Sequence, residues 1–166
     1  MQTHTRFTSA LGKSLAAIAF GAVTLVTNQA ASQQPFLYVA KFVCGRAVNT
    51  PNIPAPVATG FYFTAINVHT MVTTEFKKRV SVALPSEKAG KVTQTFGATL
   101  KDNEALEIDC PDIIKHLEFP APVPPFVKGF VTIESPRDLD VVAVYTAAAT
   151  ATGNVITLEV ERVPKR

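Results

Sequence analysis

The stretch from Phe126 to Ala149, FVKGFVTIESPRDLDVVAVYTAAA, decides the fold class of this chain. Its two runs, Phe126–Glu134 and Leu139–Thr146, are rich in β-branched and aromatic residues, and the segment 135–138 between them has residues typical of turns. The pattern predicts a β-hairpin. After Asp140 the second run is almost wholly apolar, which is typical of a strand covered on both faces near the middle of a sandwich.

Strand patterns also dominate the rest of the chain. Further strands are predicted at Phe36–Cys44, Phe61–Val68, Thr73–Leu84, Lys91–Phe96, Ala105–Cys110 and Val155–Val163. Within Thr73–Leu84 the alternation sends Lys77 and Arg79 to the wet face and Lys78 to the other. The expected core consists of Phe130, Ile133, Val142, Val144, Phe63 and Ile66.

One short helix is predicted, at Pro111–Leu117, because proline at its start and Asp112 in its first turn favour helix initiation. With about eight strands and little helix, the fold class is all-β. We expect an antiparallel β-sandwich, immunoglobulin-like or jelly-roll-like, in a single domain over residues 33–166.

The first 32 residues have the pattern of a cleaved secretory signal peptide. A weakly basic start with Arg6 and Lys13 precedes the apolar run Ser14–Val26, and small residues end at Ser32. The apolar run is shorter than the roughly 20 residues of a membrane-spanning helix, so no membrane span is expected in the mature form. The sequence therefore predicts export to the periplasm or the exterior.

Removal of this segment changes the charge balance. The chain has 16 Lys and Arg against 13 Asp and Glu, and loss of Arg6 and Lys13 leaves 14 cations against the same 13 acids. A mature protein that is nearly neutral gives no reason to expect a nucleic acid or another polyanion as partner.

Five segments together resemble a set of short exported bacterial proteins of uncharacterised function. They are FVCG ending at Gly45, AINVH ending at His69, ALEIDC ending at Cys110, VKGFVTIESP ending at Pro136 and LDVVAVYT ending at Thr146. The strand order is loosely similar to the small sandwich of sensory rhodopsin transducers. Both resemblances imply a β-sandwich and bring no active site.

Cys44 and Cys110 are the two cysteines of the chain. Export would place them in an oxidising compartment, and each ends a predicted strand, so we expect a disulfide bond between them. The alternative is a pair of buried thiols that act as small apolar residues.

Copper binding is the more specific alternative role for Cys110. His69, Cys110 and His116, with Met71, are the residue types of a blue-copper site. The spacing from Cys110 to His116 is wider than in the tight ligand loop of such a site. Several predicted strands also follow Cys110, whereas the ligand loop of a blue-copper protein precedes the last strand. We therefore expect no metal and no other cofactor, with this set as the alternative.

Catalytic motifs give little further support for an enzyme. No Gly-x-Ser-x-Gly motif occurs, and Ser135 lies in the predicted turn. The carboxylates of Glu107 and Asp109 share a strand face, and Asp138 and Asp140 have no calcium-loop spacing. The sequence therefore favours an exported, non-enzymatic binding or structural module of the bacterial envelope or exterior. Its partner would be an envelope or extracellular protein; a homo-oligomer, a self-assembling surface subunit and a small periplasmic enzyme or copper protein are the alternatives.

Overall fold

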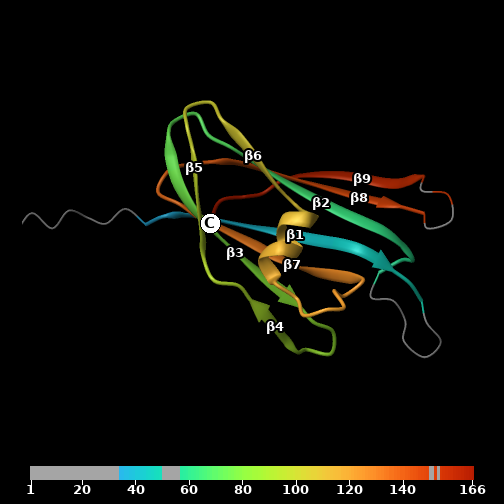
Figure 1. Cartoon of the computed structure of the whole chain (residues 1–166). Coiled ribbons are helices and arrows are strands. Elements are labelled where there is room, and N and C mark those ends of the chain that lie inside the picture. Colours follow the sequence, from blue (N-terminus) through green and yellow to red (C-terminus); the bar gives the residue numbers. More distant parts are fainter. Residues whose placement is uncertain (1–33, 50–56, 150–151, 153) are drawn as a thin grey trace, which may run out of the picture. The chain divides into compact units, whose positions relative to one another are not determined.

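A computed structural model describes residues 34–49, 57–149, 152 and 154–166 of the chain (Figure 1). The predicted signal peptide, the middle of the proline-rich loop after Gly45 and part of the loop before the last strand lie outside these residues. In chain order the described elements are β1 (Phe36–Ala47), β2 (Gly60–His69), β3 (Thr74–Ala83), β4 (Ala89–Val92), β5 (Phe96–Leu100), β6 (Ala105–Asp109), α1 (Cys110–Leu117), β7 (Phe126–Ser135), β8 (Asp140–Ala148) and β9 (Val155–Arg162).

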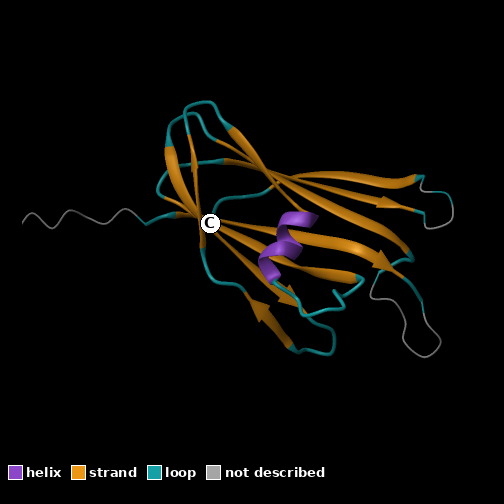
Figure 2. Ribbon diagram, viewed as in Figure 1, coloured by secondary structure: helices purple, strands orange, loops and turns teal. Residues whose placement is uncertain are grey.

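The prediction of an all-β, antiparallel fold with one short helix is confirmed for the described residues (Figure 2). All nine strands belong to one hydrogen-bonded sheet, in the order β4-β3-β7-β1-β2-β8-β9, with β5 also on β3 and β6 also on β2. The arrangement of two separately packed sheets stays a prediction. Helix α1 begins one residue before the predicted range and ends at the predicted residue. It is too short to cross a membrane, and no other described segment forms a long apolar helix.

The predicted hairpin between β7 and β8 is wrong, because these two strands do not pair. Strand β7 pairs with β1 along one edge and with β3 along the other, while β8 pairs with β2 and β9. The segment between them is therefore not a hairpin turn. It carries the chain from a position between β1 and β3 to a position between β2 and β9. Leu139 at its end is buried, and its backbone N–H donates to the Tyr38 hydroxyl at 2.8 Å.

The single strand predicted at Lys91–Phe96 is also wrong in its bounds, because it is split into β4 and β5. The buried Thr93 lies between them and takes over pairing with β3. Its backbone N–H donates to the Val80 carbonyl at 2.9 Å, and its Oγ1 accepts from the Val80 N–H at 3.0 Å. A threonine side chain thus replaces a backbone carbonyl, which interrupts the strand without leaving a buried polar group unpaired.

The sheet has two halves that meet at a short ladder. The first half comprises β1, β3, β4, β5 and β7, and the second comprises β2, β6, β8 and β9. Between the halves, β1 and β2 pair only from Gly45 to Ala47 against Gly60 to Tyr62. Both halves nevertheless contribute to one hydrophobic cluster, which includes Phe42 and Val131 from the first half and Ile66 and Val141 from the second.

Two of the six expected core residues, Ile66 and Ile133, are fully buried, but the other four predictions are wrong. Val142 and Val144 are only half-buried, and Phe63 and Phe130 are exposed on the outer face. On β7 the core position beside Phe130 is Gly129, where a Cβ atom would clash with the Ser81 carbonyl oxygen and lie 2.9 Å from the Phe42 ring. Phe42 fills the space over this glycine, so the aromatic residue next to it faces outward.

Substitutions on β8 test this assignment of faces. Val141→Asp should lower the free energy of unfolding by about 3 to 5 kcal/mol, because it buries an unpaired carboxylate in the core. Val144→Asp places the same charge on the half-buried outer face and should leave a folded protein with a clearly smaller loss. Urea unfolding of both variants measures the difference, and equal losses would contradict the orientation of β8.

Candidate binding groove beside the disulfide

Helix α1 places Cys110 at the junction between the two halves. Asp109, the last residue of β6, is the N-cap: its carboxylate accepts from the Asp112 N–H at 3.0 Å, and the Asp112 carboxylate accepts from the Asp109 N–H at 3.5 Å. This capping box ends the strand and starts the helix within one residue. The helix packs against β1, β2, β3 and β6, and its residues Ile113 and Leu117 are buried.

The predicted disulfide bond is present. Cys44 of β1 and Cys110 of α1 are bonded, with their Cα atoms 5.6 Å apart, and both residues are buried. The bond therefore joins β1 of the first half to the helix that directly follows β6 of the second half. It lies directly beside the three-residue ladder between β1 and β2.

Thr64 bridges β1 and β2 beyond the point where their backbones diverge. Its Oγ1 accepts from the Val43 N–H at 2.9 Å and donates to the Val43 carbonyl at 3.1 Å. Because Thr64 faces this buried junction, its neighbour Phe63 faces outward, and the residue is 42% exposed. The prediction that Phe63 belongs to the core is therefore wrong, and Thr64 takes the inward position.

An apolar groove of about 560 Å³ opens over the disulfide bond. No charged side chain lines it among the described residues. Gly45 forms part of its floor in a left-handed conformation with φ of 99°, where a side chain would clash with the Pro125 carbonyl. The walls are Cys44, Cys110, Phe61, Tyr62, Phe63, Pro111, Ile114, Val123, Pro124, Thr146 and Ala148.

The groove continues into an apolar outer face on β2, β8 and β9. Directly opposed residues of these three strands form three rows on the side away from the core. With strands about 4.8 Å apart and same-face residues about 6.8 Å apart, the rows span roughly 300 Å². A patch of that size reaches the range of the largest patches on monomers, which are often functional. We call these rows the apolar outer face. In the order β2, β8, β9 the first row is Phe61, Ala148 and Val155, the second is Phe63, Thr146 and Leu158, and the third is Ala65, Val144 and Val160.

A polar cluster joins the start of β1 to the segment before β8 and holds the C-terminal tail. The buried Tyr38 hydroxyl donates to Asp138 Oδ1 at 2.6 Å, and Lys165 Nζ contacts Asp138 Oδ2, also at 2.6 Å. The Arg166 N–H donates to the Leu37 carbonyl at 2.9 Å, so the tail pairs with the start of β1. Nearby, Arg162 forms an ion pair with Asp140 at 3.2 Å.

The cluster shifts the pKa values of two of its members. Burial, followed by the hydrogen bond to Asp138, raises the pKa of Tyr38 to about 12. Hydrogen bonds from Lys165 and Tyr38 hold the pKa of the Asp138 carboxyl below its ordinary value. Since each charged group has a partner of opposite charge, the arrangement explains how the chain end is anchored and assigns no reaction to it.

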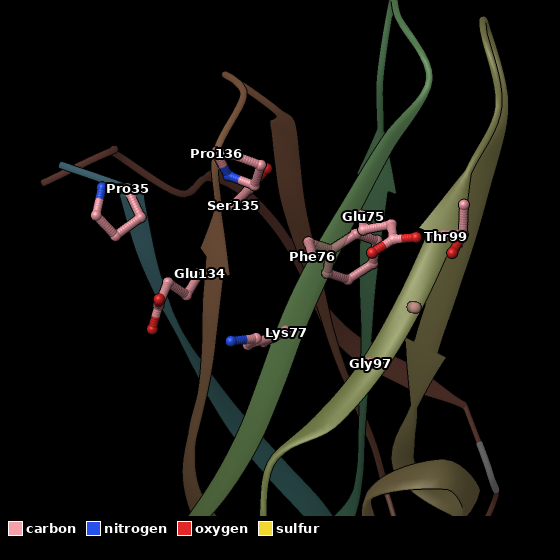
Figure 3. A pocket seen from close by; sticks show the side chains of 10 residues that line it. Pro35, Glu75, Phe76, Lys77, Gly97, Thr99, Glu134, Ser135 and Pro136 are labelled. Atoms are coloured by element: carbon pink, nitrogen blue, oxygen red, sulfur yellow. The ribbon is translucent and has the colours of Figure 1, made fainter. Parts of the chain in front are cut away.

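A second open pocket, of about 670 Å³, lies where β3, β5 and β7 meet the start of β1 (Figure 3). Figure 3 shows Glu75 beside Thr99, with Lys77 and Glu134 on neighbouring strands. Ser135 is buried, and its Oγ accepts from the Arg137 N–H at 3.1 Å, as expected for a residue that shapes a turn.

The three residues of the copper alternative lie in different surroundings. Cys110 is bonded to Cys44, so it supplies no thiolate for a blue-copper site. His69 and Met71 line a pocket next to Asp140, whereas the His116 ring lies 4.0 Å from the Phe96 ring, and burial together with the nearby Lys78 lowers the pKa of His116. Among the described residues no three His, Cys, Asp or Glu side chains form a group that could hold a metal ion.

The remaining charged residues singled out in the sequence have structural surroundings. Lys77 and Arg79 are exposed and Lys78 is half-buried on the other face, as the alternation predicts. Glu107 and Asp109 share the outer face of β6, opposite Asn67 and Ala65 of β2, and Asp109 caps the helix.

Comparison of the chain with protein-family models, with curated proteins and with solved structures finds no match. The groove and the apolar outer face are therefore interpreted from their own chemistry.

The raised pKa of Tyr38 predicts a loss of stability at high pH. A hydroxyl whose pKa is higher in the folded state stabilises the fold fully below about pH 10, and this contribution is lost between pH 10 and about 12. Urea unfolding should show a smaller loss over this interval for Tyr38→Phe than for the wild type. Asp138→Asn should fall between the two, because burial still acts on Tyr38. Equal losses in the wild type and Tyr38→Phe would contradict the prediction.

Proposed function

We propose that this protein is an exported, non-enzymatic binding module of the bacterial cell envelope or exterior, and that it holds an apolar segment of another protein in the groove beside the disulfide. The observation that carries the proposal is the continuity of an uncharged groove with the apolar outer face of β2, β8 and β9. The pattern of the first 32 residues and the disulfide bond support export, since disulfides persist in oxidising compartments.

The chemistry of the groove favours an uncharged, apolar occupant. A volume of about 560 Å³ is in the usual range for a site that takes a few side chains or a small molecule. A charged group in the groove would lose its hydration without gaining a charged partner, which costs free energy. Aromatic rings at the entrance, such as Phe61 and Phe63, provide large contact areas of the kind found at binding hot spots.

Two phenylalanines with nearly equal exposure give a matched test of the groove. Phe63 in the groove is 42% exposed, and Phe130 on the outer face of the first half is 44% exposed. Phe63→Ser should weaken binding of the uncharged apolar dye Nile red about tenfold, because it removes roughly the contribution of one buried aromatic contact. Phe130→Ser should bind the dye as the wild type does. Equal effects of the two substitutions would show that the groove is not a distinct site.

The same two positions test the function in cells. A photo-crosslinking residue at position 63 should give a discrete adduct with an envelope or extracellular protein, and the same residue at position 130 should not. The adduct should decrease when Ile114, on the groove wall, is replaced by Glu. If position 63 gives no adduct in the native host, or if both positions give the same adducts, the proposal is wrong.

A further inference from the structure

Strand β9 is a sheet edge that is exposed on both faces. It pairs with β8 alone, so the backbone groups along its other edge have no strand partner among the described residues. On its outer face Leu158 is 64% and Val160 63% exposed, and Glu159 and Glu161 on the opposite face are exposed as well. The hydrophobic core therefore contributes little to holding β9, which is held mainly by its pairing with β8.

Two of the devices that usually protect an edge strand, shortness and lysine or proline residues, are missing from β9, although it has Glu159 and Glu161 on the inward side and a register shift against β8 near its start. It is eight residues long, whereas β4 and β5 at the opposite edge have four and five. Neither lysine nor proline occurs in it, and its ladder with β8 is regular from Thr157 to Arg162. An edge strand of this length with an unpaired backbone edge can accept a strand from another chain.

The two glutamates restrict which strand can be added. If a second β9 pairs antiparallel about a two-fold axis perpendicular to the sheet, one residue lies opposite itself. An axis at Glu159 or Glu161 sets two identical carboxylates opposite each other, and an axis at Val160 sets Glu159 opposite Glu161. Like charges that oppose each other directly destabilise a pair of strands.

An axis at Leu158 avoids every such clash. Leu158 then lies opposite Leu158 on the outer face, and Glu159 lies opposite Thr157, at which the regular part of β9 begins. Of the residue-centred registers without opposed glutamates, this one keeps the longest part of the two strands paired. The charge pattern of β9 is therefore compatible with a second copy of itself in this register.

We propose that β9 is the interface between two copies of this chain, which pair antiparallel about a two-fold axis at Leu158. The apolar outer faces of the two copies become neighbours across the axis and form one continuous face. This inference goes beyond the proposed function and does not depend on it, since it rests on the free edge and charge pattern of β9 and not on the groove.

Sedimentation velocity of the purified protein measures the association. The wild type should sediment with the mass of two chains and dissociate on dilution. Leu158→Lys places two ammonium groups opposite each other and should raise the dissociation constant at least about tenfold. Because Leu158 is exposed, the variant should keep the unfolding midpoint of the wild type. Val92→Lys, which changes an exposed valine on the opposite edge strand β4, should dimerise normally.

Single cysteines test the register itself. Leu158→Cys places two thiols directly opposite each other, where Cα atoms are about 5 Å apart and can be bridged, so mild oxidation should give a covalent dimer. Val160→Cys serves as the control, because its equivalents are offset by four residues, or about 13 Å along the strands. A monomer at all concentrations, equal loss of association in Val92→Lys, or equal cross-linking of Val160→Cys would each overturn the proposal.

Discussion

The structure depends on how two half-sheets are held together where their backbones barely pair. Strands β1 and β2 share a ladder of only three residue pairs, and beyond it Thr64 bridges to the backbone of Val43. The Cys44–Cys110 bond lies beside this junction and closes a separation of 66 residues. In the chain-entropy model a loop of that length corresponds to about 4 kcal/mol, which is a large share of the stability of a small domain.

The same junction explains why apolar residues lie outside the core. Because Thr64 and the disulfide occupy the interior between β1 and β2, the rings of Phe61 and Phe63 project from the other side of β2. Gly45 and Pro125 come close together there and leave an uncharged hollow. The proposed groove is thus a consequence of the way the halves are joined, and β8 and β9 extend its apolar character to the edge of the sheet.

Much of the fold could be predicted from the sequence because strand composition and turn residues are local signals. The alternation around Lys77 and Arg79 and the short helix were predicted in this way, and the disulfide was predicted from the two cysteines and the expected export. Strand pairing is not local: β7 and β8 follow each other in the chain, yet each finds its partners elsewhere. The inward face was misread where Gly129 and Thr64 occupy core positions, because packing against Phe42 and hydrogen bonds to Val43 decide these positions. The groove was missed as well, since one of its two phenylalanines, Phe63, was assigned to the core.

The central claim is that the bond between Cys44 and Cys110 holds the two halves around one core. It is tested most directly by counting thiols in the denatured, unreduced protein and then comparing urea unfolding before and after reduction. The structure predicts no free thiol, and a loss of about 4 kcal/mol in the free energy of unfolding on reduction. A free thiol on both cysteines of each chain, or a free energy of unfolding that reduction leaves unchanged, would contradict it.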